Sequence, residues 1–279
     1  MKNLFSIILL VLSPVTQAGT FEISVPGYTA EVGEHKAEGN EHSLIVLSLH
    51  GKEKGRRHDG NLSFADELAA NGYTTYTPQM PWYEYKAPVS TAYAVLDALI
   101  KKVAKGKKVV VTGHSQGAPF AFFYTTDHKP PREVIGSVLL APGHLIHRSY
   151  KIQRVTVESV LRAKQLLAEG AGNQEQEFDD FNGGGRIGNK TIITTPLIYL
   201  SYFDLDTTPN FLDLITKARL PLLWVDGKND RLAKRMSYDE IYASAREHPQ
   251  NHYTIVEGGH VSMWENAVPA VIRWLNIFR

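Results

Sequence analysis

The chain has 279 residues, 43% hydrophobic and 21% charged, which excludes a disordered chain, and its 22 Gly and 14 Pro exclude a collagen-like one. It contains no cysteine, which excludes thiolate metal sites, iron–sulfur clusters, disulfides and a cysteine nucleophile. The 30 Lys and Arg nearly balance the 29 Asp and Glu, so no strong basic field points to nucleic acid as a partner.

Residues 1–18 have the pattern of a secretory signal peptide. Lys2 supplies the positive start, residues 4–12 form a short apolar run, and Thr16 and Ala18 place small residues where a signal peptidase reads. An N-terminal membrane anchor is the alternative, but the run is well short of the ~20 residues that a spanning helix needs. We therefore expect no stable membrane anchor after cleavage, and secretion to the bacterial periplasm or exterior.

Strand-like and helix-like segments alternate along most of the chain after residue 18. Apolar runs that predict strands lie at 43–49, 73–77, 108–112, 134–141, 220–225 and 253–256. Runs that predict helices lie at 62–71, 89–105, 118–126, 234–247 and 264–278. This alternation predicts right-handed βαβ units, and therefore an α/β fold with a mostly parallel twisted sheet and helices on both faces.

The alternation is interrupted between Gly143 and Ala218, although residues 155–169 predict an amphipathic helix there. We interpret 143–218 as a small cap inserted into a single domain at 19–279. The glycines at 183–188 match G-x-G-x-x-G, but the preceding residues 178–182 are not strand-like and no helix follows. A loop is therefore favoured over a dinucleotide site.

The central motif is Gly-His-Ser-Gln-Gly at residues 113–117. It lies between a predicted strand and a predicted helix, the strand–turn–helix setting that such a motif requires. A serine at the tip of this turn presents its hydroxyl to solvent, and the two glycines leave room for the neighbouring strand and helix. The backbone N–H of Gln116 then points at the oxyanion that develops when Ser115 attacks a carbonyl.

A serine nucleophile needs a base, and the base needs an orienting acid. His260 follows the predicted strand at 253–256, and Asp230 follows the one at 220–225. Both residues are therefore expected to lie at the same edge of the sheet as Ser115. This edge, at the carboxyl ends of the strands, is where open α/β sheets bind ligands.

The chain resembles an α/β-hydrolase fold serine hydrolase over nearly all of residues 20–279. The resemblance rests on the motif at 113–117, Leu-His-Gly at 49–51, Asp-Gly-Lys-Asn-Asp at 226–230 and Glu-Gly-Gly-His at 257–260. It implies that Ser115 is the nucleophile, His260 the general base and Asp230 the acid.

Three alternatives remain for the partners of the serine. Asp226 lies closer to its strand end than Asp230 does and is the second candidate for the acid. His248 and His252 are rivals of His260, but both precede the last strand or lie at its start.

The resemblance also implies a second oxyanion donor after His50. We assign it to the backbone N–H of Lys52, with Gly51 as the alternative. The basic run that starts at Lys52 would attract an anionic substrate, although a solvated loop is the favoured interpretation.

Aromatic side chains follow the predicted strand at 73–77, on the expected catalytic edge. We predict that Trp82, Tyr83 and Tyr85 bind substrate by lining an acyl or aryl pocket; packing against the insertion is the alternative. His50, His58 and Asp59 are too loosely spaced to predict a metal site, and no cofactor is expected.

The predicted function is cleavage of a carboxylic ester, in a small-molecule ester or related acyl substrate, by a Ser-His-Asp acyl-enzyme mechanism. Thioesterase, lysophospholipase and amidase or peptidase activity use the same triad and remain alternatives, as does a non-catalytic hydrolase-like binding protein. The sequence does not predict the oligomeric state.

Overall fold

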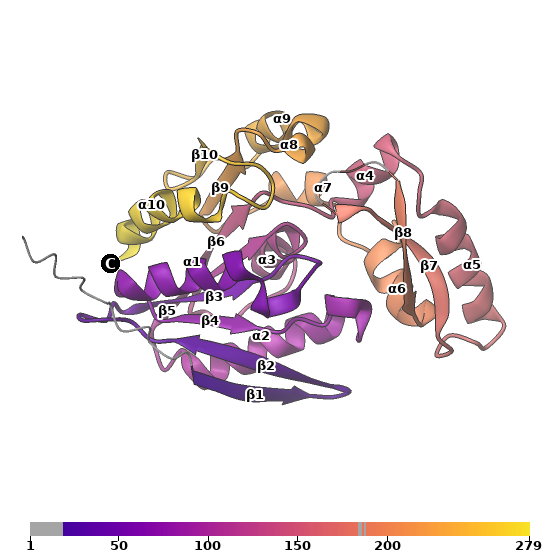
Figure 1. The fold of residues 1–279 in the computed structure, drawn as a ribbon, viewed down its shortest axis with the longest axis horizontal. Helices are drawn as coiled ribbons and strands as arrows, with labels where there is room; N and C mark the ends of the chain where they lie inside the picture. The colour runs from indigo at the N-terminus through magenta and orange to yellow at the C-terminus, as the bar shows by residue number, and fades with distance from the viewer. Residues whose placement is uncertain (1–18, 184–185, 187) are drawn as a thin grey trace, which may run out of the picture.

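A computed structural model describes residues 19–183, 186 and 188–279 (Figure 1). The predicted signal peptide at 1–18 and part of the glycine-rich segment at 183–188 lie outside the described residues. Within the described ranges, no helix combines the length and the apolar character that crossing a membrane requires.

The core is an eight-stranded sheet with the order β1-β2-β4-β3-β5-β6-β9-β10. The second strand is antiparallel to both of its neighbours, and the pairs from β4 to β10 are parallel. The strands are β1 (Gly19–Val25), β2 (Tyr28–His35), β3 (Leu44–Leu49), β4 (Thr75–Pro78), β5 (Lys108–His114), β6 (Val134–Leu140), β9 (Leu222–Gly227) and β10 (His252–Val256).

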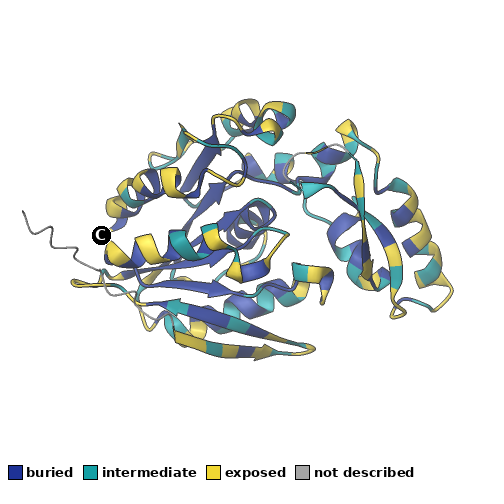
Figure 2. Ribbon diagram, in the orientation of Figure 1, coloured by how far each residue is buried: buried dark blue, intermediate teal, exposed yellow. Residues whose placement is uncertain are grey.

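Helices cover both faces of the sheet, which is why the central strands are continuously apolar. In β3, Leu44 and Val46 pack into one cluster with helices α1 (Asp59–Ala70) and α10 (Trp264–Leu275). Ile45 and Leu47 of the same strand pack into the other cluster, with α2 (Val89–Val103) and α3 (Gly117–Thr126). The central strands are buried, whereas the edge strand β1 has exposed residues, as do the outer faces of the helices (Figure 2). The predicted α/β fold is confirmed.

Two parts of this domain differ from the sequence prediction. The hairpin of β1 and β2 was not predicted; it turns at Gly27, whose φ of +75° suits glycine. The single helix predicted at 234–247 is wrong, because two short helices, α8 (Arg231–Met236) and α9 (Tyr238–Ala243), lie on either side of Ser237. Ser237 has a φ of +52°, which ends the first helix.

The chain between β6 and β9 forms a lobe at the right of Figure 1, which contains the insertion at 143–218. A two-stranded antiparallel sheet runs through it, and residues 178–182, expected not to form a strand, belong largely to this sheet. Phe178 packs against Tyr199 with ring centroids 4.4 Å apart, and burial of this ring favours the strand. The elements of the lobe are α4 (Ile146–Ile152), α5 (Val157–Ala168), β7 (Gln176–Phe181), β8 (Asn189–Thr194), α6 (Pro196–Phe203) and α7 (Phe211–Ile215).

Candidate active site

Ser115 occupies the tight turn between β5 and α3. Its φ is +52°, a left-handed conformation that a non-glycine residue adopts only when the surroundings impose it. A Cβ at residue 113 would lie 2.1 Å from the Gly117 carbonyl oxygen, and a Cβ at 117 would lie 2.6 Å from the carbonyl oxygens of residues 49 and 50. Both positions therefore require glycine, as the motif predicts.

The structure brings together the three side chains that the sequence singled out. The Nε2 atom of His260 lies 2.8 Å from the Oγ atom of Ser115, and its Nδ1 atom lies 2.8 Å from Oδ2 of Asp230. Asp230 is fully buried, and His260 is 8% exposed. The contacts from serine to imidazole to carboxylate are continuous, with the carboxylate fully buried and the serine partly exposed.

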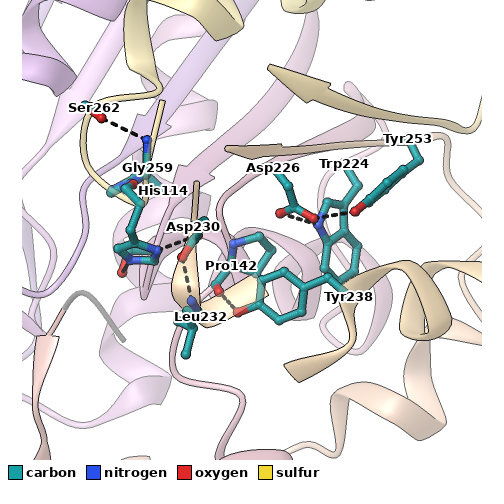
Figure 3. Close-up of polar contacts among 12 residues, drawn as sticks. His114, Pro142, Trp224, Asp226, Asp230, Leu232, Tyr238, Tyr253, Gly259 and Ser262 are labelled. Atoms are coloured by element: carbon teal, nitrogen blue, oxygen red, sulfur yellow. Dashed lines mark hydrogen bonds and ion pairs between the residues drawn. The ribbon is translucent and has the colours of Figure 1, made fainter. Parts of the chain in front are cut away.

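Asp230 caps the N-terminus of α8, where its Oδ1 atom accepts a hydrogen bond from the Leu232 amide at 2.7 Å (Figure 3). Burial alone would raise the pKa of Asp230. The hydrogen bonds from His260 and from the amides of Leu232 and Ala233, with the charge of His260, outweigh burial and lower this pKa below its usual value. The carboxylate is therefore ionised and oriented toward the imidazole.

The alternative partners lie elsewhere. Asp226 accepts hydrogen bonds from Trp224 Nε1 at 2.9 Å and from the Tyr253 hydroxyl at 2.7 Å (Figure 3). Burial raises the pKa of Asp226 to about 7. His252 is exposed, and the Nδ1 atom of His248 accepts from the Gln250 amide. These contacts favour Asp230 and His260 as partners of the serine.

His114, the second residue of the serine motif, was given no role by the sequence. Its Nε2 atom donates a hydrogen bond to the main-chain carbonyl of His260 over 2.6 Å, and its ring packs against Trp264. Burial lowers the pKa of His114 to about 3, so the imidazole is neutral and Nε2 carries its proton toward this carbonyl.

Both residues predicted as oxyanion donors line one narrow cavity, of about 50 Å³, with Ser115 and His260. Gly143 belongs to this cavity as well: a Cβ there would lie 2.9 Å from Ser115 Oγ. Gly51 is close to the serine, but Lys52 and Gln116 are the predicted donors that line the cavity.

The three predicted substrate-binding aromatics do not line this cavity. Trp82, Tyr83 and Tyr85 line a separate, larger cavity of about 480 Å³, which shares Lys52 with the cavity of Ser115. Trp82 is fully buried and donates to the His50 carbonyl at 3.1 Å. The binding of substrate by these three residues stays a prediction.

Lys52, the first residue of the basic run, does not have the solvated side chain that the interpretation as a solvated loop predicts. The ammonium of Lys52 is 2.7 Å from Asp180 Oδ1, and this carboxylate, from β7, is fully buried. Arg56 is buried as well and pairs with Glu31. Asp180 lies in the segment that the sequence assigned to an irregular region, and no sequence signal pointed to it.

The histidines considered for a metal have other partners. The Nε2 atom of His50 accepts from the Met80 amide at 2.9 Å, and the Nδ1 atom of His58 accepts from the Gly60 amide at 3.0 Å. Over the part of the chain that the structure describes, no group of three or more His, Asp or Glu side chains could hold a metal ion.

The sheet order, its one reversed strand and the positions of these residues at the carboxyl ends of β5, β9 and β10 define an α/β hydrolase. The family model described as serine aminopeptidase, S33, matches residues 40–266, and the chain belongs to this family. A comparison with curated proteins finds no match.

Several solved structures share the fold. Est1E from Butyrivibrio proteoclasticus is 14% identical, with a TM-score of 0.61 over 93% of this chain and 98% of that one. A soluble variant of monoglyceride lipase from Saccharomyces cerevisiae, in complex with a substrate analogue, is 16% identical, with a TM-score of 0.65 over 95% and 96%. Dienelactone hydrolase from Anabaena variabilis is 15% identical, with a TM-score of 0.54 over 94% and 95%.

Proposed function

We propose that this hydrolase cleaves a carboxylic ester through an acyl-enzyme. Ser115 Oγ attacks the carbonyl carbon while His260 takes the hydroxyl proton, and His260 then delivers that proton to the departing alcohol. Water, deprotonated by the same imidazole, releases the acid. Asp230 holds the imidazole in the tautomer that presents Nε2 to the serine.

The backbone N–H groups of Gln116 and Lys52 stabilise the oxyanion in this proposal, a contribution of about 3–4 kcal/mol per donor. A backbone donor tolerates any side chain, so a charged residue at position 52 is compatible with the role. The side chain of Lys52 is turned away to Asp180 at 2.7 Å, which leaves its main chain to serve the oxyanion.

The observation that carries the proposal is the pair of 2.8 Å contacts that join Ser115 to His260 and His260 to the buried Asp230. A structural histidine would not need both a serine hydroxyl and a buried carboxylate at hydrogen-bond distance, whereas nucleophilic catalysis requires both.

The cavity chemistry favours an ester over the N-terminal peptide bond of an aminopeptidase. An aminopeptidase must bind a free α-ammonium group, which calls for a carboxylate near the nucleophile. Among the described residues, the charged side chains that line the cavity are Lys52, Arg186 and Arg235, and no carboxylate lines it.

The test is hydrolysis of p-nitrophenyl esters of graded acyl length by the mature protein, beside Ser115→Ala. We expect activity in the wild type, its loss in the variant, and an acyl-length optimum that reports the pocket size. Full activity of Ser115→Ala would overturn the mechanism.

Labelling with a fluorophosphonate probe separates the alternatives. A labelled wild type without ester hydrolysis would favour thioesterase, lysophospholipase or amidase activity on the same triad. Absence of both labelling and hydrolysis would favour a non-catalytic binding protein.

Secretion remains a proposal that rests on the pattern at residues 1–18. Expression in a Gram-negative host, fractionation and N-terminal sequencing test it. We expect a periplasmic product that begins at Gly19; an unprocessed cytoplasmic chain would contradict the proposal.

A further inference from the structure

We propose that Asp180, in the insertion, is a positioning residue that fixes the oxyanion loop through the side chain of Lys52. The oxyanion loop is residues 50–54, the connection that leaves β3 beside the nucleophile. This inference rests on the proposed function, because it assigns a role in the same reaction.

The main chain of the oxyanion loop passes close to Ser115. A Cβ at Gly51 would lie 3.2 Å from Ser115 Cβ. A displacement of the next residue, Lys52, by a fraction of an ångström therefore changes the distance between its N–H and the oxyanion. Catalysis by preorganised donors is sensitive to displacements of this size.

A buried ionic contact joins the oxyanion loop to the insertion. The Lys52 ammonium donates to Asp180 Oδ1 at 2.7 Å and to the Phe181 carbonyl at 3.0 Å. The Lys52 side chain is 12% exposed and that of Asp180 is fully buried. In contrast, the pair formed by Glu53 and Lys190 is longer, at 3.8 Å, and exposed on both sides.

The second oxygen of Asp180 is held as well. Tyr85 donates its hydroxyl to Asp180 Oδ2 at 2.8 Å, and burial, followed by the nearby Asp180 charge, raises the pKa of Tyr85 well above its usual value. Tyr85 is itself tied to β8, because its carbonyl accepts from Thr194 Oγ1 at 2.8 Å. The carboxylate is thus fixed by two donors from the hydrolase domain.

A buried ion pair is poor evidence for stability, because desolvation of both charges offsets much of their attraction. The consequence of this pair is geometric, because the Lys52 ammonium has one position in which the charge of Asp180 compensates its own. Because the Lys52 side chain is fixed in that position, the main chain of the oxyanion loop is fixed beside the nucleophile turn, where a Cβ at Gly51 would lie 3.2 Å from Ser115 Cβ. In this arrangement the insertion is part of the catalytic apparatus and not only a cover.

The test compares Asp180→Asn with Asp179→Asn, which changes a neighbouring carboxylate in β7 that accepts from Ser159 Oγ and Asn189 Nδ2 and does not contact Lys52. For Asp180→Asn we expect kcat per titrated active site to fall by roughly 10- to 100-fold, with KM within about twofold. Affinity for an alkylboronic acid, which forms a tetrahedral adduct with the serine, is expected to fall by the same factor. Asp179→Asn is expected to stay within about twofold of the wild type on each measure.

Two further measurements separate positioning from simple support of the fold. Amide hydrogen exchange in residues 49–57 should be faster in Asp180→Asn and unchanged in Asp179→Asn. The double variant Lys52→Met, Asp180→Asn should be no slower than the slower single variant, because both changes remove the same contact.

Unchanged exchange, or a lower active-site titre with unaltered kcat per site, would overturn the role of Asp180. Whether the proposed function fails is determined separately, by comparing ester hydrolysis by the wild type and by Ser115→Ala. The exchange measurement does not depend on any substrate, so it decides the loop contact in either case.

Discussion

The imidazole of His114 holds the main chain of His260 through a 2.6 Å hydrogen bond to its carbonyl. The residue before the proposed nucleophile, Ser115, thereby fixes the residue that we propose as its base. The two rings lie 5.3 Å apart, so the turn that presents Ser115 and the loop that presents His260 are braced directly against each other.

Replacing His114 by Phe tests this brace. The ring volume is kept, but the buried carbonyl of His260 loses its donor, which costs about 1–3 kcal/mol of stability. We expect kcat/KM for a p-nitrophenyl ester to fall by roughly tenfold or more as the base loses its fixed position. The exposed His252→Ala is the control and should match the wild type; equal activity of His114→Phe would refute the brace.

Gly143 is expected to be intolerant of any side chain. A Cβ there would lie 2.9 Å from Ser115 Oγ and 3.3 Å from its carbonyl carbon. Gly143→Ala should therefore lower kcat/KM by roughly 10- to 100-fold with little change in melting temperature. Gly19→Ala, whose Cβ would meet its nearest atom at an ordinary 3.6 Å, is the matched control.

Asp230 and Asp226 can be separated by activity. Asp230→Asn keeps the side-chain shape but favours the wrong imidazole tautomer, and we expect kcat to fall by about 10⁴-fold. Asp226→Asn should keep most of the activity, because Asp226 contacts Trp224 and Tyr253 and not the imidazole. The reverse ranking would make Asp226 the acid.

Asp226 should give the protein a specific pH dependence of stability. Its folded-state pKa of about 7 lies above the ordinary value of 3.8, so between these pH values the folded state retains a proton that the unfolded state has lost. Stability should therefore fall as pH rises through this window, by up to about 4 kcal/mol. Asp226→Asn should remove this slope.

Chemical denaturation at pH 5 and pH 8 measures this difference. The free energy of unfolding of Asp226→Asn, relative to that of the wild type, should be higher at pH 8 than at pH 5. An amide can still accept from Trp224 and donate to the Tyr253 hydroxyl, so the local contacts are preserved. Parallel pH profiles for the two proteins would contradict the prediction.

Local sequence patterns predicted most of the hydrolase domain. Apolar runs such as 108–112 and helical spacing such as that of 89–105 are short-range properties, and the strands and helices form where they occur. The patterns failed where a contact distant in sequence decides the conformation. Residues 176–181 form a strand because Phe178 packs on Tyr199, and the helix expected at 234–247 is divided at Ser237.

The sequence by itself determined the parallel sheet and the candidates Ser115, Asp230 and His260, because each follows a strand and the carboxyl ends of parallel strands share one edge. Only the tertiary structure showed the 2.8 Å contact of Asp230 with His260, the contact of His114 with His260, and the contact of Asp180 with Lys52. The last two residues are 128 positions apart. No local pattern encodes such a pair, since it forms only when the insertion folds back over the oxyanion loop.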